Sequence, residues 1–285
     1  MSDTTTELTI RMAGPSDKLA ICTLLQQAWH SAGGARWDQL DALGTGCAAL
    51  VACRGSQTVG LCLFDLRVPS VARLSAVAVA DHEQVTDIWQ ALWETAEPYL
   101  YKHGAQSAFY VGEAPWLLEA LTEQGFQLVN RVISYEKIQD GPSIAGHPGV
   151  RLRLARPGDL RTVEEVDRTS FPLLWRYSRP LLEIALQPPS RLVVSELDRQ
   201  IVGYQLSTQE ASEGQIIRLA VRPDYRRQGI GSRLLADTLA TFRRGRVRHV
   251  SLNTQSDNLP AQRLYERFGF QRTGEELPVL EKPLA

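Results

Sequence analysis

The chain has 285 residues, of which 44% are hydrophobic and 22% are charged, and its formal net charge is −1. This composition is typical of a globular protein with room for two domains, and the near-zero charge gives no reason to expect nucleic acid or an anionic membrane as a partner. No apolar run approaches the roughly 18 residues of a membrane span, and the polar start at residues 1–6 does not resemble a signal peptide. A cytoplasmic protein is therefore predicted.

The four cysteines lie in the first quarter of the chain. They are Cys22, Cys47, Cys53 and Cys62, and no two of them form a Cys-x-x-Cys pair. Because a chain of this size does not need disulfides to stabilise its core, buried free thiols are predicted. His249 has no partners at ligand spacing, so no metal site is predicted.

Two halves of the sequence resemble each other. Residues 10–17 (IRMAGPSD) return as residues 152–159 (LRLARPGD), an offset of 142 with four of eight positions identical. Both copies predict a strand, a proline turn and a helix that begins near an aspartate. Hairpins predicted at residues 50–60 and 193–203, and the dipeptides at residues 125–126 and 269–270, keep offsets of 143 and 144. So steady an offset indicates duplication.

The predicted domains are residues 1–138 and 150–285, joined by a linker at residues 139–149 that contains two prolines and three glycines. Each domain is expected to be an α/β (α+β) fold with a mixed, mostly antiparallel sheet flanked by helices.

The most informative stretch is residues 216–242. An apolar strand ends before Pro223, a basic turn follows from Arg226 to Gly231, and apolar residues at helical spacing then predict an amphipathic helix. The first N–H groups of such a helix lack partners and favour an anion, and the glycines allow a ligand to approach the backbone. A phosphorylated ligand would suit the site, although a plain chain reversal is also consistent with a glycine pair.

Two related phosphate motifs are excluded. Ser232 is not preceded by the lysine of a P-loop, and the Gly-x-Gly-x-x-Gly dinucleotide fingerprint is absent. The turn reads Arg-x-x-Gly-x-Gly.

That turn resembles the pyrophosphate loop of the GNAT superfamily of acyl-CoA-dependent N-acyltransferases. Residues 252–270 resemble the family's next strand, its asparagine, its Ala-x-x-Leu-Tyr helix and its closing Gly-Phe, so the similarity covers residues 150–285. The resemblance implies that acetyl-CoA is the acyl donor and that the pyrophosphate is bound by backbone N–H groups from Arg227 to Ser232. The pantetheine arm would pair with the main chain of Leu219 and Val221. The cofactor-binding residues expected on this basis are Leu219, Ala220, Val221, Arg226, Arg227, Gln228, Gly229, Ile230, Gly231, Ser232 and Asn258.

The same resemblance assigns Tyr265 to the family's tyrosine, which protonates the leaving thiolate. A core aromatic on the face of Leu264 and Phe268 is the other interpretation. The N–H of Val221 would polarise the thioester carbonyl for direct attack by an amine, and no covalent nucleophile is predicted.

The general base is not assigned. Relatives often have a carboxylate on the central strand, where this chain has only Arg218, and Asn253 stands where a related group has glutamate. Glu210 and Glu213 are candidates for the base, but they are also what solvated charges in a turn would look like. Proton removal through ordered water is a further option.

The acceptor loops are expected at residues 170–175 (SFPLLW), which are equally consistent with a hydrophobic plug. Arg176, Tyr177 and Arg179 are expected near the same opening, and arginines there would favour an anionic acceptor.

In the N-terminal copy, residues 77–88 replace the glycine turn with a segment that has no Arg, no Gly and three carboxylates. Because these charges would repel a pyrophosphate, a structural or substrate-shaping role is predicted for this degenerate GNAT-like half. The whole is predicted to be a tandem N-acetyltransferase that acts on a primary amine, either a small molecule or a peptide N-terminus, with no nucleic-acid or membrane partner. The alternatives are a non-catalytic acyl-CoA-binding regulatory protein and an N-terminal half that delivers a macromolecule.

Overall fold

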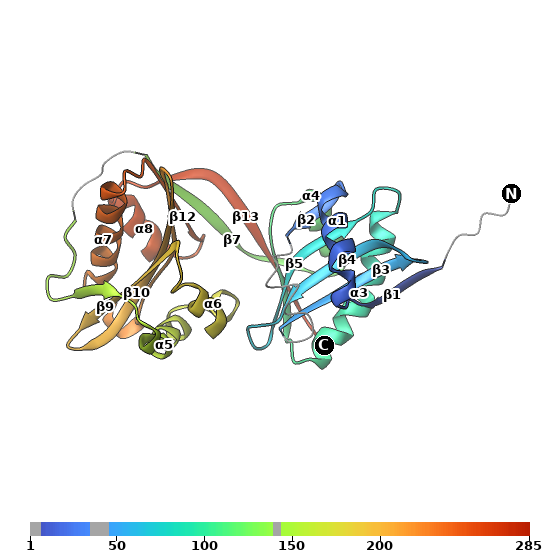
Figure 1. The fold of residues 1–285 in the computed structure, drawn as a ribbon, viewed down its shortest axis with the longest axis horizontal. Coiled ribbons are helices and arrows are strands. Elements are labelled where there is room, and N and C mark those ends of the chain that lie inside the picture. The colour runs from blue at the N-terminus through green and yellow to red at the C-terminus, as the bar shows by residue number, and fades with distance from the viewer. Residues whose placement is uncertain (1–6, 35–45, 139–143) are drawn as a thin grey trace. The chain divides into compact units, whose positions relative to one another are not determined.

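The computed structural model describes residues 7–34, 46–138 and 144–285. The chain forms two compact units, Met1–Asn130 with Leu277–Ala285, and Arg131–Glu276. They are called the N-terminal and C-terminal units below, and both are drawn in Figure 1. No helix of the described residues is both long enough and apolar enough to cross a bilayer.

The first half of the chain supplies seven strands and three α-helices within its described residues. In chain order these are β1 (Leu8–Met12), α1 (Lys18–Gln27), β2 (His30–Gly33), β3 (Cys47–Arg54), β4 (Gln57–Asp65), β5 (Val71–Val79), α3 (Val85–Lys102), β6 (Ser107–Val111), α4 (Pro115–Glu123) and β7 (Gln127–Lys137).

The second half repeats most of this order. Its elements are β8 (Arg151–Leu154), α5 (Leu160–Ser170), α6 (Arg179–Ile184), β9 (Ser190–Leu197), β10 (Gln200–Glu210), β11 (Glu213–Val221), α7 (Ile230–Arg244), β12 (His249–Gln255), α8 (Leu259–Arg267) and β13 (Gln271–Pro283). The predicted strand, turn and helix of residues 216–242 and both predicted hairpins are confirmed.

Each unit has one mixed sheet. In the C-terminal unit the strands follow the order β7-β12-β11-β10-β9-β8, and in the N-terminal unit the order is β1-β3-β4-β5-β6-β13. The pairs β11–β12 and β5–β6 are parallel and the other neighbours are antiparallel. The predicted fold class, a mostly antiparallel sheet flanked by helices, is therefore confirmed.

The compact units do not follow the chain order that the predicted boundary assumes. Residues 132–137 of β7 pair with β12 in the C-terminal unit, and residues 279–283 of β13 pair with β6 in the N-terminal unit. The strands of each unit thus include one from the other half of the sequence. The predicted linker begins at residues 139–143, which lie outside the described residues.

Helices cover both faces of the C-terminal sheet (Figure 1). On β11, Ala220 packs in a core with α5 and α6, whereas its neighbours Leu219 and Val221 pack against the first turns of α7. This alternation is the two-residue period of a strand buried on both faces, and it explains why β11 ends in the apolar run Leu219 to Val221.

The repeat is also visible in a pair of ion pairs. Arg11 binds Asp17 at 2.7 Å and Arg153 binds Asp159 at 2.6 Å, each at the turn before the first helix of its half. Asp17 and Asp159 also accept backbone N–H bonds from the residues three positions earlier. The same local device therefore begins both halves.

The four cysteines form no disulfide, and three of them are buried whereas Cys22 is half-buried, so the predicted burial is confirmed for three of the four. Burial raises the pKa of the Cys62 thiol to about 12, so this sulfur stays protonated and unreactive near neutral pH.

Candidate functional site

One edge of β11 is left without a strand partner. β11 pairs with β10 along its whole length, but with β12 only from Glu213 to Ile216. Beyond Ile216, that edge faces no strand among the described residues. The Arg222 N–H donates to Val202 on β10 at 2.9 Å, and because peptide directions alternate along a strand, the N–H groups of Leu219 and Val221 face the unpaired edge.

The chain then turns into α7 in a conformation that exposes backbone donors. Arg227 and Gly229 have positive φ angles of 61° and 80°, and α7 begins at Ile230. None of the N–H groups of residues 227–232 donates a hydrogen bond within the described ranges, and the first helical bond runs from Arg233 to Gly229 at 3.0 Å. Six consecutive donors at the positive end of a helix form a nest of the kind that favours an anion.

The side chains of the turn have different tasks. Arg226 donates from Nε to Val221 O at 3.2 Å and from Nη2 to Ser170 O at 3.1 Å, so it ties the turn to β11 and to the end of α5. Gln228 donates to the Asp224 carbonyl at 3.3 Å. Arg227 is exposed and forms no ion pair in the described part of the chain, so its charge remains available to a ligand at the nest.

A segment that the sequence assigned to the linker lies against this turn. His147 N–H donates to Gly229 O at 3.2 Å. Gly146 has a φ of 74°, and a Cβ at this position would lie 2.4 Å from the backbone nitrogen of Arg233. Glycine is therefore required where the segment crosses the first turn of α7. No local pattern predicted this contact, because glycine and proline in a linker give the same signal.

Tyr265 lies on α8 and is 6% exposed, with its ring 6.0 Å from both Tyr135 and Phe270. Burial raises the pKa of its hydroxyl to about 12, so the group carries its proton at neutral pH. The hydroxyl forms no hydrogen bond with a described residue. The two interpretations of Tyr265, a proton donor and a core aromatic, are compatible with each other, because a ring packed in the core can hold a protonated hydroxyl in place.

Asn258 caps α8. Its Oδ1 accepts from Ala261 N–H at 3.4 Å and its Nδ2 donates to Thr254 Oγ1 at 3.1 Å. The side chain orders the start of the helix that carries Tyr265, and it lies in the turn after β12.

The two candidate bases lie at the wrong end of the central strand. Glu213 is eight positions from Val221 along β11, which is roughly 27 Å of extended chain, and Glu210 pairs with Glu213 across the turn. Glu213 accepts from His249, whose other ring nitrogen lies 3.1 Å from Glu136. These two carboxylates raise the pKa of His249, and the cluster joins three strands far from the α7 turn.

The arginines expected to attract an anionic acceptor have partners. Arg179 forms ion pairs with Glu183 at 3.0 Å and Glu164 at 3.8 Å, and Arg176 donates to the Phe171 carbonyl at 3.1 Å. The hydroxyl of Ser170 donates to Val221 O at 3.2 Å, which places the start of the SFPLLW segment at the unpaired edge of β11.

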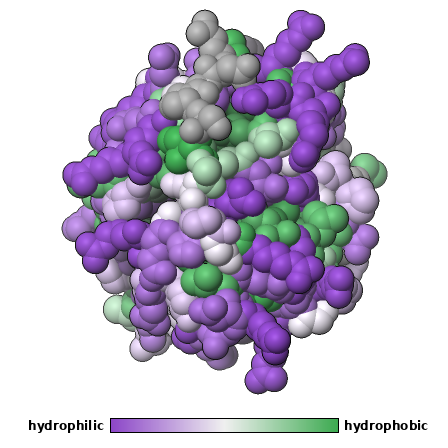
Figure 2. All heavy atoms as spheres, turned by 90° about the vertical axis from the view of Figure 1, so that its left-hand side faces the viewer, coloured by the Kyte–Doolittle hydropathy of each residue, from purple (hydrophilic) through white to green (hydrophobic). Residues whose placement is uncertain are grey.

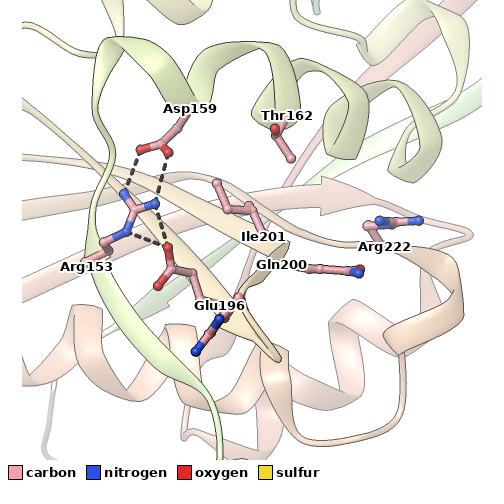
Figure 3. Close-up of a pocket in the computed structure, with 8 residues that line it drawn as sticks. Arg153, Asp159, Thr162, Glu196, Gln200, Ile201 and Arg222 are labelled. Carbon is pink, nitrogen blue, oxygen red and sulfur yellow. Dashed lines mark hydrogen bonds and ion pairs between the residues drawn. The ribbon is translucent and has the colours of Figure 1, made fainter.

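A separate surface pocket of about 380 Å³ lies near the β9–β10 turn and contains none of the predicted site residues. Figure 3 shows Arg153 between Asp159 and Glu196 on one side of this pocket, while Arg222 extends away from them. Because two carboxylates already surround Arg153, the pocket is not strongly cationic. The face of the molecule in Figure 2 is largely hydrophilic, with apolar areas separated by polar ones. No group of three or more metal-ligating side chains occurs in the residues the structure describes.

Residues 160–270 match the Acetyltransferase (GNAT) family. A Bacillus subtilis protein with the provisional name ribosomal protein bS18-alanine N-acetyltransferase is 30% identical over 123 residues, which are 43% of this chain and 82% of the relative.

Two similarities extend over both halves. A mycothiol acetyltransferase of Propionibacterium freudenreichii is 25% identical over 250 residues, 82% of this chain and 77% of the relative. The solved structure of a tandem GNAT protein from the clavulanic acid biosynthesis pathway superposes with a TM-score of 0.64 at 16% identity, and it covers 98% of this chain and 99% of that one. The second similarity concerns the fold alone.

Proposed function

The chain belongs to the Acetyltransferase (GNAT) family and is an acyl-CoA-dependent acetyltransferase, and on this premise we propose that its C-terminal unit transfers an acetyl group from acetyl-CoA to a primary amine. One observation carries the proposal. The unpaired edge of β11 leads directly into the turn at residues 227–232, whose six N–H groups are free to bind an anion within the described chain.

The residues present suit the donor. A pantetheine arm has amide groups that can pair with an unpaired strand edge, as an added β-strand does, and Leu219 and Val221 offer main-chain groups on that edge. A pyrophosphate fits the nest at the start of α7, with Arg227 as a nearby cation. Bound acetyl-CoA would supply an activated thioester, and the chain's own residues would orient it.

The proposed chemistry needs two donors besides the nest. The N–H of Val221 faces the unpaired edge and would donate to the developing oxyanion of the thioester carbonyl. Tyr265 keeps its proton at neutral pH because its pKa is about 12, and it would pass that proton to the departing sulfur. Glu210 and Glu213 lie too far away to act as the base, which leaves removal of the amine proton to water at the site.

The acceptor is proposed by analogy with the named relatives. One of them is named for an alanine of a ribosomal protein and another for mycothiol. A peptide N-terminus and a small-molecule amine are both consistent with this pair. An anionic acceptor is not favoured, because the arginines expected to attract one are engaged.

The test is thiol release from acetyl-CoA by the full-length protein, with an alanine-initiated tripeptide amide and with glucosamine as amines. The proposal expects release that depends on the amine and saturates with it. Tight acetyl-CoA binding without release on either amine would instead support a regulatory acyl-CoA-binding protein. Absence of acetyl-CoA binding would contradict both functions.

A further inference from the structure

Three polar side chains are buried together on the α5 face of the C-terminal sheet. Asp167 of α5 and Tyr204 of β10 are 0% exposed, and Arg218 of β11 is 9% exposed. The chemistry proposed above uses none of them. Two buried charges are costly to maintain, and replacing such a pair with apolar residues is often neutral, so a role other than stability is expected.

The three side chains satisfy one another. Arg218 donates from Nε to Asp167 Oδ2 at 2.5 Å and lies 2.8 Å from the Tyr204 hydroxyl oxygen. The Tyr204 hydroxyl also donates to Asp167 Oδ2. Burial raises the pKa of Tyr204 well above its usual value, so this hydroxyl remains a donor.

The other hydrogen bonds and ring contacts that the cluster forms within the described chain go to one loop, residues 171–178. Arg218 donates from Nη2 to the carbonyl of Trp175, and the Tyr177 N–H donates to Asp167 Oδ1 at 2.8 Å. The guanidinium carbon of Arg218 lies 3.7 Å from the ring centroid of Phe171 and 4.0 Å from that of Tyr177. Arginine stacks on aromatic faces in this way because its flat cation is weakly hydrated.

The loop that this cluster holds lies beside the unpaired edge of β11. Ser170, just before the loop, bonds to Val221 O at the unpaired edge of β11, and the loop is attached further along to Arg218 of the same strand. It therefore lies beside the part of β11 where the thioester is proposed to bind. The charge of Arg218 is fully used inside the cluster, so Arg218 is not available to an acceptor.

We propose that Asp167, Tyr204 and Arg218 are positioning residues that hold loop 171–178 as a rigid wall of the acceptor site, and that this wall selects amines flanked by an apolar group. The selectivity follows from the loop's own side chains. Leu173 is 37% exposed, Phe171, Leu174 and Trp175 are partly exposed, and the nearby arginines are engaged. This inference rests on the proposed acetyl transfer in the C-terminal unit.

The test uses a variant that removes both buried charges at once, Asp167→Asn with Arg218→Met, so that neither charge is left unpaired. Arg218→Lys keeps the charge but loses the stacked, forked geometry. The matched control is Arg191→Met with Asp237→Asn, which removes an ion pair of 2.9 Å between β9 and α7 in the same unit. Circular dichroism and thermal melting select the variants that fold.

Three measurements follow on the full-length protein: hydrogen exchange of loop 171–178, acetyl-CoA binding by calorimetry, and steady-state kinetics with Ala-Leu-Ala amide and Ala-Asp-Ala amide. In the charge-free variant the loop amides should exchange at least tenfold faster. The KM for Ala-Leu-Ala amide should rise at least tenfold, with kcat and the acetyl-CoA Kd within threefold of wild type. Arg218→Lys should fall between wild type and this variant, and wild type should prefer Ala-Leu-Ala amide at least tenfold in kcat/KM.

Unchanged loop exchange, or a KM no different from that of the control variant, would overturn the positioning role. A preference for Ala-Asp-Ala amide would overturn the apolar selectivity. Failure of wild type to bind acetyl-CoA is a different result, seen in the calorimetry alone, and would overturn the proposed function itself.

Discussion

The central strands of the two units, β5 and β11, have the same pairing pattern, but their open edges differ. In the N-terminal unit the parallel pairing of β5 with β6 covers Val71–Leu74 only, and in the C-terminal unit that of β11 with β12 covers Glu213–Ile216 only. The two sets of positions differ by 142 (71 to 213, and 107 to 249), which matches the repeat in the sequence. Both sheets therefore split at the same place, and each leaves one edge of its central strand unpaired by the neighbouring parallel strand.

The units differ in whether a strand pairs with that open edge. In the N-terminal unit, β2 pairs antiparallel with β5 from Ala76 to Val79, on the edge that β6 has left. The approach is close, since a Cβ on Gly33 would lie 2.0 Å from the Ser75 carbonyl oxygen. The N-terminal unit thus occupies with its own chain the place that the C-terminal unit is proposed to offer to pantetheine.

The turns after these strands differ less in charge than the sequence suggests. The predicted repulsion relied on carboxylates before α3, but Glu83 binds Arg54 at 2.6 Å and Asp81 accepts the Trp29 N–H at 2.8 Å. These partners reduce the repulsion. The clearer structural difference is therefore the pairing of β5 with β2, which has no counterpart at the unpaired edge of β11 among the described residues.

The largest effect is expected from the α7 turn. Gly229→Asp with Gly231→Asp places two carboxylates at the anion nest, where they compete for its N–H groups and repel phosphate, so the acetyl-CoA Kd should rise about 1,000-fold. Thr86→Asp adds a carboxylate at the exposed start of α3 and should leave the Kd unchanged. Calorimetry measures the acetyl-CoA Kd of both variants. A large effect of Thr86→Asp would mean that the N-terminal unit also takes part in acetyl-CoA binding.

Tyr265→Phe should lower kcat about 100-fold, the lower range for loss of a general acid, with little change in the acetyl-CoA Kd. The N-terminal control is Tyr110→Phe, another buried tyrosine whose pKa is raised by burial. Thiol-release kinetics distinguish them. An active Tyr265→Phe enzyme would leave Tyr265 with its core-packing role alone.

Ala32→Pro tests whether the pairing of β2 with β5 keeps acetyl-CoA out of the N-terminal unit. Proline removes a backbone donor from β2 and should destabilise the unit by about 1–3 kcal/mol, measured by urea unfolding. No second acetyl-CoA site is expected, because α3 lacks the glycine turn. A second site in this variant would mean that β2 alone excludes the ligand.

The smallest effects are expected from the ion pair that precedes the first helix of each half, Arg11–Asp17 and Arg153–Asp159. Arg11 holds the pKa of Asp17 at about 2, below its usual value of 3.8, and Arg153 lowers the pKa of Asp159. The folded protein therefore binds fewer protons than the unfolded chain, and the stabilisation present above pH 4 is lost as the pH falls toward 2. Asp17→Asn and Asp159→Asn should each cost about 1 kcal/mol at pH 7 and flatten this pH dependence. Equal stability curves for wild type and both variants would contradict it.

Local sequence patterns predicted the repeat, the hairpins and the strand, turn and helix at residues 216–242, because alternation, turn residues and helical spacing act over short distances. They did not predict β2, whose sequence His-Ser-Ala-Gly has no β-branched side chain and which pairs through its backbone. They also missed the exchange of β7 and β13 between the sheets, and the Asp167–Arg218 pair, whose members are 51 positions apart. Such contacts depend on tertiary packing.

The most direct test of this difference between the units is the number of acetyl-CoA molecules that one full-length chain binds in a calorimetric titration. We expect one site per chain, abolished by Gly229→Asp with Gly231→Asp and unaffected by Thr86→Asp. Two sites, or one site that survives the glycine substitutions, would contradict it.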